Sequence, residues 1–224
     1  MRNFNSAFNH VINYFSVIPY LYRYENKEYI DTFFETGELL ISSFYNYKKY
    51  SDNELGDREE GSSMNIARGD NDLTFASFGT VGMNEFSFCT STIFDKSLLT
   101  AFSRNSLFRI IDPLNFILEV TRSLQRVNQV IHGQCIYLDH RILNKNVSRV
   151  SMESLKSEEG GISAEKLLQV SSFVSGMDSY FLKQKKYQHQ SEYRILWQTD
   201  REVKDSIIVN CPEAIKYCEK VEIE

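Results

Sequence analysis

The sequence predicts an α+β fold with a strand-rich core and inserted helices. Three observations lead to this prediction. Several short runs alternate between apolar and polar residues, as half-buried strands do. Other segments repeat apolar residues at three- and four-residue steps, as amphipathic helices do. Strand-like runs outnumber helical ones and are interrupted by them irregularly, which favours α+β over a doubly wound sheet.

The length and composition favour one domain over residues 1–224, with polar loops near 46–72 and 141–162. The net charge of −5 argues against a general nucleic-acid coat, which needs a basic face. The four cysteines form no CxxC pair, so we expect reduced structural thiols and no metal. No apolar run reaches the ~20 residues that span a bilayer. We therefore expect a cytoplasmic protein with no membrane partner.

The first elements are predicted from apolar periodicity and from residues that begin or end helices. Apolar residues predict an amphipathic helix from Phe4 to Phe15, which Pro19 ends. The run Tyr20 to Tyr24 then predicts a strand. Asn26 can cap a second helix that ends at Gly37, and residues 38–42 predict a short strand.

The middle and end of the chain predict further strands and helices. Residues 73–78 and 85–94 are strand-like and separated by glycines, which indicates a hairpin. Asp112-Pro113 begins a helix that we expect to continue to Gly133. Ser163 caps a helix towards Phe181 whose apolar stripe we expect in the core. The remaining predicted elements are strands at 134–138, 190–197, 206–210 and 220–223 and a short helix near 212–218.

The run Gln190 to Trp197 is the most informative segment. Its alternation places Tyr193, Ile195 and Trp197 on an apolar face. Gln190, Glu192 and Arg194 then share the other face at about 7 Å spacing. A solvated strand face with one ion pair is the simpler interpretation of these three residues, and a catalytic row is the alternative.

Two further patterns combine strand propensity with groups that bind ligands. Thr90, Ser91 and Thr92 end an aromatic-rich strand. Such hydroxyl residues suit strand ends, and they can also hydrogen-bond a ligand or orient a carboxylate. Arg23 lies between two tyrosines on an early strand, either exposed or gripping a phosphate with its planar guanidinium.

These three patterns occur in an informative order. Arg23, then Thr90-Ser91-Thr92, then Gln190-x-Glu192 resembles the arginine class of the ADP-ribosyltransferase superfamily. That class carries an arginine, a Ser-Thr-Ser-type triplet and a Gln- or Glu-x-Glu pair in this order. The triplet here is Thr-Ser-Thr. The resemblance implies a split, mixed sheet and NAD as substrate.

A second resemblance spans most of the chain. It is to a family of uncharacterised bacterial and phage proteins that share an "lYrY" strand, an acidic "D-x-x-E-G" loop and a final "E-x-R". The corresponding segments here are Leu21 to Tyr24, Asp57 to Gly61 and Glu192 to Arg194. As an ADP-ribosyltransferase, the chain is expected to be an antiphage effector or toxin component, with an antitoxin or regulatory protein as a further partner.

The first resemblance also implies roles for residues. Glu192 and Gln190 are the expected catalytic residues, with Glu192 stabilising the ribose cation and Gln190 orienting the acceptor. Arg23, Tyr24, Thr90, Ser91 and Thr92 are the expected NAD-binding residues. Gln at the first position of the pair implies a protein or nucleic-acid acceptor other than an arginine side chain.

Two other functions stay open. One is a non-catalytic domain of a defence system that binds a nucleotide or a protein. The other is a metal-dependent nuclease in which Asp57, Glu59 and Glu60 join Glu192 around Mg²⁺. The histidines stand at no spacing that supports a Ser/His or Cys/His hydrolase.

Overall fold

The computed structural model describes residues 20–49, 54, 56–70, 73–146 and 150–223. The contacts within the chain divide it into two compact units. Unit 1 contains residues 1–58, 82–135 and 187–224, and unit 2 contains 59–81 and 136–186. The chain therefore passes between the units after residues 58, 81, 135 and 186. The single domain predicted over 1–224 stays a prediction.

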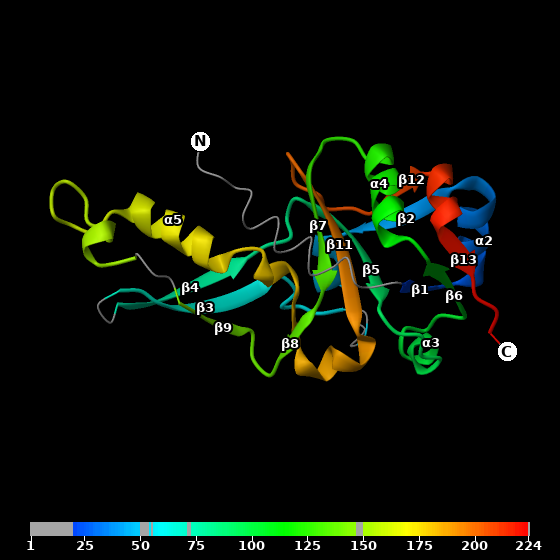
Figure 1. Ribbon diagram of the computed structural model, residues 1–224, viewed down its shortest axis with the longest axis horizontal. Helices are drawn as coiled ribbons and strands as arrows, with labels where there is room; N and C mark the ends of the chain where they lie inside the picture. The colour runs from blue at the N-terminus through cyan, green and yellow to red at the C-terminus, as the bar shows by residue number, and fades with distance from the viewer. Residues whose placement is uncertain (1–19, 50–53, 55, 71–72, 147–149, 224) are drawn as a thin grey trace. The chain divides into compact units, whose positions relative to one another are not determined.

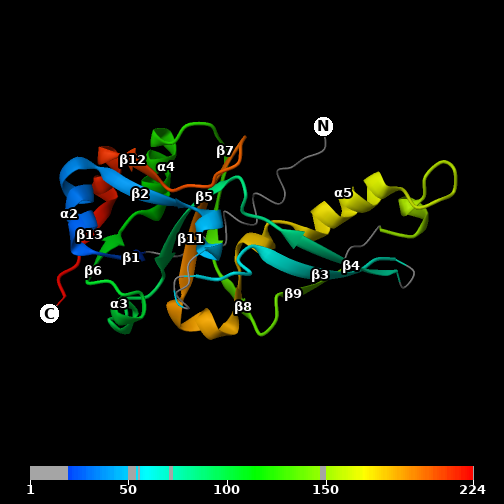
Figure 2. The same ribbon diagram turned by 180° about the vertical axis from the view of Figure 1, so that it is seen from behind.

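Unit 1 is built on a large sheet whose described strand pairs are all antiparallel. The strands run β12-β2-β5-β1-β6-β13, and β11 pairs with both β5 and β7. Figure 1 and Figure 2 show β11 between these two strands from opposite sides. The strands are β1 (Leu21–Glu25), β2 (Glu38–Ser43), β5 (Glu85–Ser91), β6 (Ser106–Ile110), β7 (Val127–Gln134), β11 (Glu192–Thr199), β12 (Ile207–Asn210) and β13 (Cys218–Lys220).

The sheet divides along one edge of β5. β11 pairs with β5 over its whole length, from Glu85 to Ser91. Because β11 takes one edge completely, β2 and β1 must share the other. β2 pairs there at residues 86–87 and β1 at Ser91. Residues 88–90 of β5 therefore lie where β1 and β2 diverge.

Two helices of unit 1 begin where the sequence predicts, and one of them, α2, also ends there. α2 (Lys27–Thr36) follows Asn26 and ends at Gly37, whose φ of 81° favours glycine. α4 (Pro113–Ser123) begins at Asp112, which accepts a hydrogen bond from Asn115 N. The remaining helical elements are α3 (Ser97–Ala101) and the 3-10 segments η1 (Phe44–Lys48), η4 (Lys185–Gln190) and η5 (Pro212–Tyr217).

The core of unit 1 lies where α2, α4 and η5 pack on the sheet. The apolar alternation in β11 places Tyr193, Ile195 and Trp197 in this core, as predicted. Trp197 Nε1 also donates to Thr121 Oγ1 at 2.8 Å, so the indole nitrogen keeps a partner inside the core. The core-facing side of β11 is thus fixed, and its other side carries Glu192 and Arg194.

Unit 2 contains the parallel strand pairs. β3 (Ser62–Arg68) pairs antiparallel with β4 (Thr74–Thr80) and parallel with β9 (Ile142–Asn146). β8 (Ile136–Leu138) pairs parallel with β10 (Leu182–Gln184). Its other elements are α5 (Ala164–Ser175), η2 (Glu153–Leu155) and η3 (Asp178–Tyr180). With helices and sheets of mixed direction, the α+β prediction is confirmed.

The structure corrects the two predicted polar loops. β3 lies within residues 46–72, and β9 lies within 141–162. In β3 the buried positions are Ser63, Asn65 and Ala67, small or polar side chains that give no apolar alternation. Apolar alternation therefore could not identify β3 as a strand.

Two further predictions were wrong in detail. Residues 73–78 and 85–94 form no hairpin, because β4 pairs with β3 and β5 belongs to unit 1. α4 ends at Ser123, and β7 occupies residues that were assigned to it. Arg126 adopts a φ of 60°, so the chain turns there without a glycine or proline.

The helix capped by Ser163 exists, but its stripe is largely exposed. Ser163 accepts from Lys166 N, as predicted, and α5 ends at Ser175 instead of near Phe181. Val174 is 1% exposed and packs with Ala67. Leu168 and Phe173 are 68% and 74% exposed, so the expectation that this stripe is core was wrong for them.

Two further expectations concern the predicted first helix and membrane-spanning segments. The helix predicted from Phe4 to Phe15 lies outside the described residues. None of the helices in the described part of the chain has the length and apolar character needed to cross a membrane.

Candidate functional site at the start of β11

Three adjacent strands bring the predicted site residues together. Glu192 of β11 lies opposite Ser91 of β5, and Ser91 lies opposite Tyr22 of β1. Residues directly opposite in antiparallel strands have Cβ atoms about 5 Å apart on the same face. Ser91 and Glu192 thus lie side by side on one face, whereas Thr90 lies opposite Tyr193, whose side chain faces the core. Arg23 follows Tyr22 and lies at the point where β1 leaves β5.

The hydroxyls of Thr90, Ser91 and Thr92 hydrogen-bond backbone carbonyls on both sides of Glu192. Thr90 Oγ1 donates to Tyr193 O at 3.0 Å, and Ser91 Oγ donates to Gln190 O at 2.8 Å. Thr92 Oγ1 and Thr92 N both bond Ser191 O, at 3.2 and 2.9 Å. Each hydroxyl bonded to a neutral carbonyl contributes about 1 kcal/mol net. These side chains therefore hold the chain on both sides of the carboxylate.

Gln190 does not share a strand face with Glu192. It ends η4, and β11 begins only at Glu192. Between them Ser191 has a φ of 44°, a left-handed conformation that breaks the two-residue alternation. The Gln190 amide Nε2 instead donates to Glu54 O and Glu54 Oε2, at 2.9 and 3.0 Å. The predicted row of three polar side chains is therefore reduced to Glu192 and Arg194.

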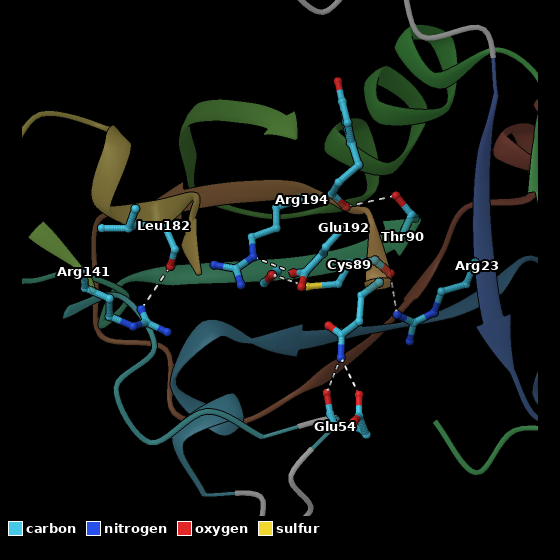
Figure 3. Close-up of polar contacts among 11 residues, drawn as sticks. Arg23, Glu54, Cys89, Thr90, Arg141, Leu182, Glu192 and Arg194 are labelled. Carbon is cyan, nitrogen blue, oxygen red and sulfur yellow. Dashed lines mark hydrogen bonds and ion pairs between the residues drawn. The ribbon is translucent and has the colours of Figure 1, made fainter. Parts of the chain in front are cut away.

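Glu192 and Arg194 form a buried ion pair. Arg194 Nε donates to Glu192 Oε1 at 2.6 Å, and the side chains are 2% and 8% exposed for Arg194 and Glu192. The guanidinium carbon also lies 5.4 Å from the centre of the Phe44 ring. Figure 3 shows Arg194 and Glu192 pointing toward each other, with Cys89 beside the carboxylate. A solvated strand face, the simpler interpretation of the sequence, is not what forms here.

Two weak acids lie beside this pair. Burial, with the nearby charge of Glu192, raises the pKa of the Cys89 thiol to about 11. Burial above all raises the pKa of Tyr47 well above its ordinary value, and its hydroxyl is hydrogen-bonded to Cys89. Both groups therefore stay protonated at neutral pH. Tyr47 and Phe44 belong to η1, whose first residues bring two aromatic rings to this face of the sheet.

Arg23 fills the gap where β1 and β2 diverge. Its Nη1 donates to Cys89 O at 2.8 Å, and its Nη2 bonds Glu25 Oε2 at 2.9 Å. The guanidinium carbon lies 4.7 Å from the centre of the Phe88 ring. In Figure 3, Arg23 approaches this carbonyl from the side of β1. The carbonyl of Cys89 thereby gains a donor on the edge of β5 where neither β1 nor β2 pairs at this residue.

Tyr24 points to a different environment. Its hydroxyl donates to Ile93 O at 3.1 Å and accepts from Asp95 N at 2.8 Å. Its ring packs with Leu98 and Leu107. Tyr24 thus fixes the segment after β5 and is not brought to the carboxylate of Glu192 by these contacts.

Sequence reasoning missed Phe44, Tyr47 and Glu54. Each lies in or near the segment interpreted as a polar loop, and no spacing motif marks it. One signal was present: Phe44, Tyr45 and Tyr47 are three aromatic residues within four positions, which is unusual for a solvated loop. Because aromatic side chains bury large areas, such a cluster indicates packing against the core.

The acidic residues Glu59 and Glu60, considered above as metal ligands, belong to unit 2. Glu60 is 2% exposed, and Glu59 accepts from Gln184 Nε2 at 3.3 Å within unit 2. In the described ranges, no three His, Cys, Asp or Glu side chains are grouped closely enough to hold a metal ion.

Comparison with known proteins gives no relative for this chain. No family model, no curated protein and no solved structure matches it. Function is therefore inferred from the residues and their geometry.

Proposed function

We propose that the chain transfers ADP-ribose from NAD to a protein or nucleic-acid acceptor, with Glu192 as the catalytic carboxylate. The observation that carries the proposal is the register that places Glu192 opposite Ser91 on adjacent strands, beside the strand that bears Arg23. The ADP-ribosyltransferases that the sequence resembles carry these residue types in the same order along the chain. A sheet that divides beside β5 further supports this type of core.

The chemistry follows from the charge that develops. When the bond between nicotinamide and ribose breaks, its electron pair leaves with nicotinamide and the ribose becomes cationic, as in glycoside cleavage. A fixed carboxylate stabilises that cation. The acceptor nucleophile then bonds to the same ribose carbon and loses its proton. In this proposal Glu192 supplies the negative charge, and Thr90, Ser91 and Thr92 fix the backbone that carries it.

The site also suggests changes to the predicted roles. Gln190 is held by Glu54, so we assign it to positioning this segment instead of orienting the acceptor. Arg23 has protein partners at both terminal nitrogens. Its contact with the NAD pyrophosphate stays a prediction and would require an exchange of these partners.

One observation favours a second candidate, a non-catalytic binding domain. The hydroxyls of Thr90, Ser91 and Thr92 all donate to backbone carbonyls, so their bonds are those of structural groups. A domain that merely kept this architecture would preserve the same contacts. The two functions differ in one measurable respect, the consumption of NAD.

A labelling experiment tests the proposal. Wild-type protein is incubated with cell lysate and NAD that is radiolabelled in its adenine. We expect label in a protein or nucleic-acid fraction, and none with the variant Glu192→Gln. The matched control is Glu213→Gln, which changes an exposed glutamate paired with Lys216. If wild type labels no acceptor and leaves NAD intact, the transferase proposal is wrong and the binding domain is favoured.

A further inference from the structure

We propose that Arg194 is a positioning residue that holds the carboxylate of Glu192 in a single orientation, and that the ring of Phe44 holds the Arg194 guanidinium in turn. The catalytic part of this inference rests on the proposed function. The geometric part does not, because it concerns only how one carboxylate is held. The alternation in β11 left Arg194 either as an ion-pair partner of Glu192 or as part of a catalytic row, and no sequence pattern pointed to Phe44.

The contact geometry supports a fixed orientation. Arg194 Nε donates to Glu192 Oε1 at 2.6 Å, and both residues belong to the same strand. Their backbones are fixed by the pairing of Glu192 with Ser91 and of Arg194 with Cys89. With the backbone fixed, the side-chain rotamers are the remaining freedom. A short charge-assisted hydrogen bond in a buried site restricts those of Glu192.

The ring of Phe44 provides the next support. Phe44 is fully buried, and the guanidinium carbon of Arg194 lies 5.4 Å from its centre. Arginine stacks on aromatic faces, and the interaction strengthens when both groups are removed from water. Phe44 thus supports Arg194, and Arg194 supports Glu192, so a series of contacts connects a buried ring to the proposed reacting carboxylate.

The other groups around Glu192 differ from Arg194 in charge or distance. Ser91 and Cys89 come from β5, and Tyr47 comes from η1. The raised pKa values of Cys89 and Tyr47 keep both neutral, so neither balances a carboxylate. Arg23 bonds Glu25 and the carbonyl of Cys89. Arg194 is therefore the cation whose removal changes the surroundings of Glu192 most.

An activity-independent measurement tests the geometric part. The protein is labelled with carbon-13 at glutamate side-chain carboxyls, and the Glu192 resonance is assigned by its loss in Glu192→Gln. In Arg194→Met, the carboxyl should take up a proton at a pH about one unit or more above that of wild type, because its cation is gone. Arg194→Lys should lie between the two. Equal midpoints in wild type and both variants overturn the inference.

Removing one partner of a buried ion pair is strongly destabilising, so a milder variant keeps the test decisive. Phe44→Leu leaves both charges in place and removes only the ring. We expect the Glu192 midpoint to move in the same direction by a smaller amount. If Arg194→Met does not fold, unchanged titration in both Phe44→Leu and Arg194→Lys overturns the inference.

Kinetics test the catalytic part. If wild type consumes NAD, Arg194→Met should lower kcat about 10- to 100-fold with a smaller change in KM, because misplaced groups affect the reaction more than binding. Added guanidinium ion at concentrations that leave the protein folded should restore part of kcat in this variant, but not in Glu192→Gln. An unchanged kcat in Arg194→Met overturns the positioning role. If wild type is inactive, the proposed function fails, and the titration still decides how Glu192 is held.

Discussion

A Cβ atom at Gly82 would lie 2.0 Å from Cδ1 of Phe44, so the aromatic ring occupies the space that any other side chain at position 82 would need. Gly82 also has a φ of 100°, where other L-residues are strained. This residue precedes β5 by only a few positions, and Phe44 follows β2 directly. The close approach therefore ties η1 to the sheet at the side where Arg194 stacks on Phe44.

Gly82→Ala should destabilise the protein through this contact. Overpacking costs about 1–3 kcal/mol, and the positive φ adds about 1 kcal/mol or more. Urea denaturation measures the change in the free energy of unfolding. The control is Gly161→Ala, because a Cβ there meets its nearest atom at an ordinary 3.9 Å. A loss for Gly82→Ala no larger than that of the control would show that Phe44 is free to move aside.

Ser91→Ala should cost about 1–3 kcal/mol of stability. It removes the bond from Ser91 Oγ to Gln190 O and the acceptor for Ile93 N, in a residue that is 2% exposed. Ser87→Ala on the same strand is the matched control. The Ser87 hydroxyl has a 3.5 Å contact with Cys89 Sγ, a weak bond, so we expect a smaller loss. Denaturation midpoints compare the two, and equal losses would contradict a holding role for the triplet.

His132 should make stability depend on pH. Burial lowers the pKa of His132, whose Nδ1 lies 2.6 Å from the Tyr193 hydroxyl. The unfolded histidine, with a pKa of about 6.5, then binds more protons than the folded one. Stability from this group is present above about pH 6.5 and is lost as the pH falls through that value.

A variant isolates this contribution. His132→Gln should show a shallower fall in the free energy of unfolding between about pH 7.5 and 5.5 than wild type does. His140→Gln, at an exposed histidine, is the matched control. Thermal denaturation across this range provides the comparison. A slope for His132→Gln equal to that of wild type would assign the pH dependence to other groups.

The two sides of α5 should respond differently to substitution. Val174→Ala should cost about 1–2 kcal/mol, because Val174 is buried against Ala67. Phe173→Ser should change stability by less than about 0.5 kcal/mol, since the ring is 74% exposed. Hydrogen exchange of the α5 amides reports both changes locally. A large loss of protection in Phe173→Ser would show that this ring is packed in solution.

The sequence predicted the fold where its signals were local. Gly37 and Asp112-Pro113 marked helix limits through backbone preference and capping, and the alternation in β11 identified its core side. Prediction failed where the buried positions are not apolar. β3 buries Ser63, Asn65 and Ala67, so no apolar alternation marked it or its pairing with β4, the next strand along the chain.

The same distinction applies to the site. The order of Arg23, Ser91 and Glu192 along the chain predicted strands that lie together. Their hydrogen bonds were not predictable, because they depend on register and on the left-handed turn at Ser191. Phe44 reaches Arg194 across separate elements, a relation that has no spacing signature in the sequence.

Nicotinamide release from NAD by purified protein tests the central claim most directly. We predict equal rates for wild type and Glu213→Gln, and a rate at least about 100-fold lower for Glu192→Gln, since a preorganised charge that stabilises the transition state contributes at least this much. Circular dichroism verifies that all three proteins are folded. Equal rates for wild type and Glu192→Gln, or no release by wild type, would contradict the account.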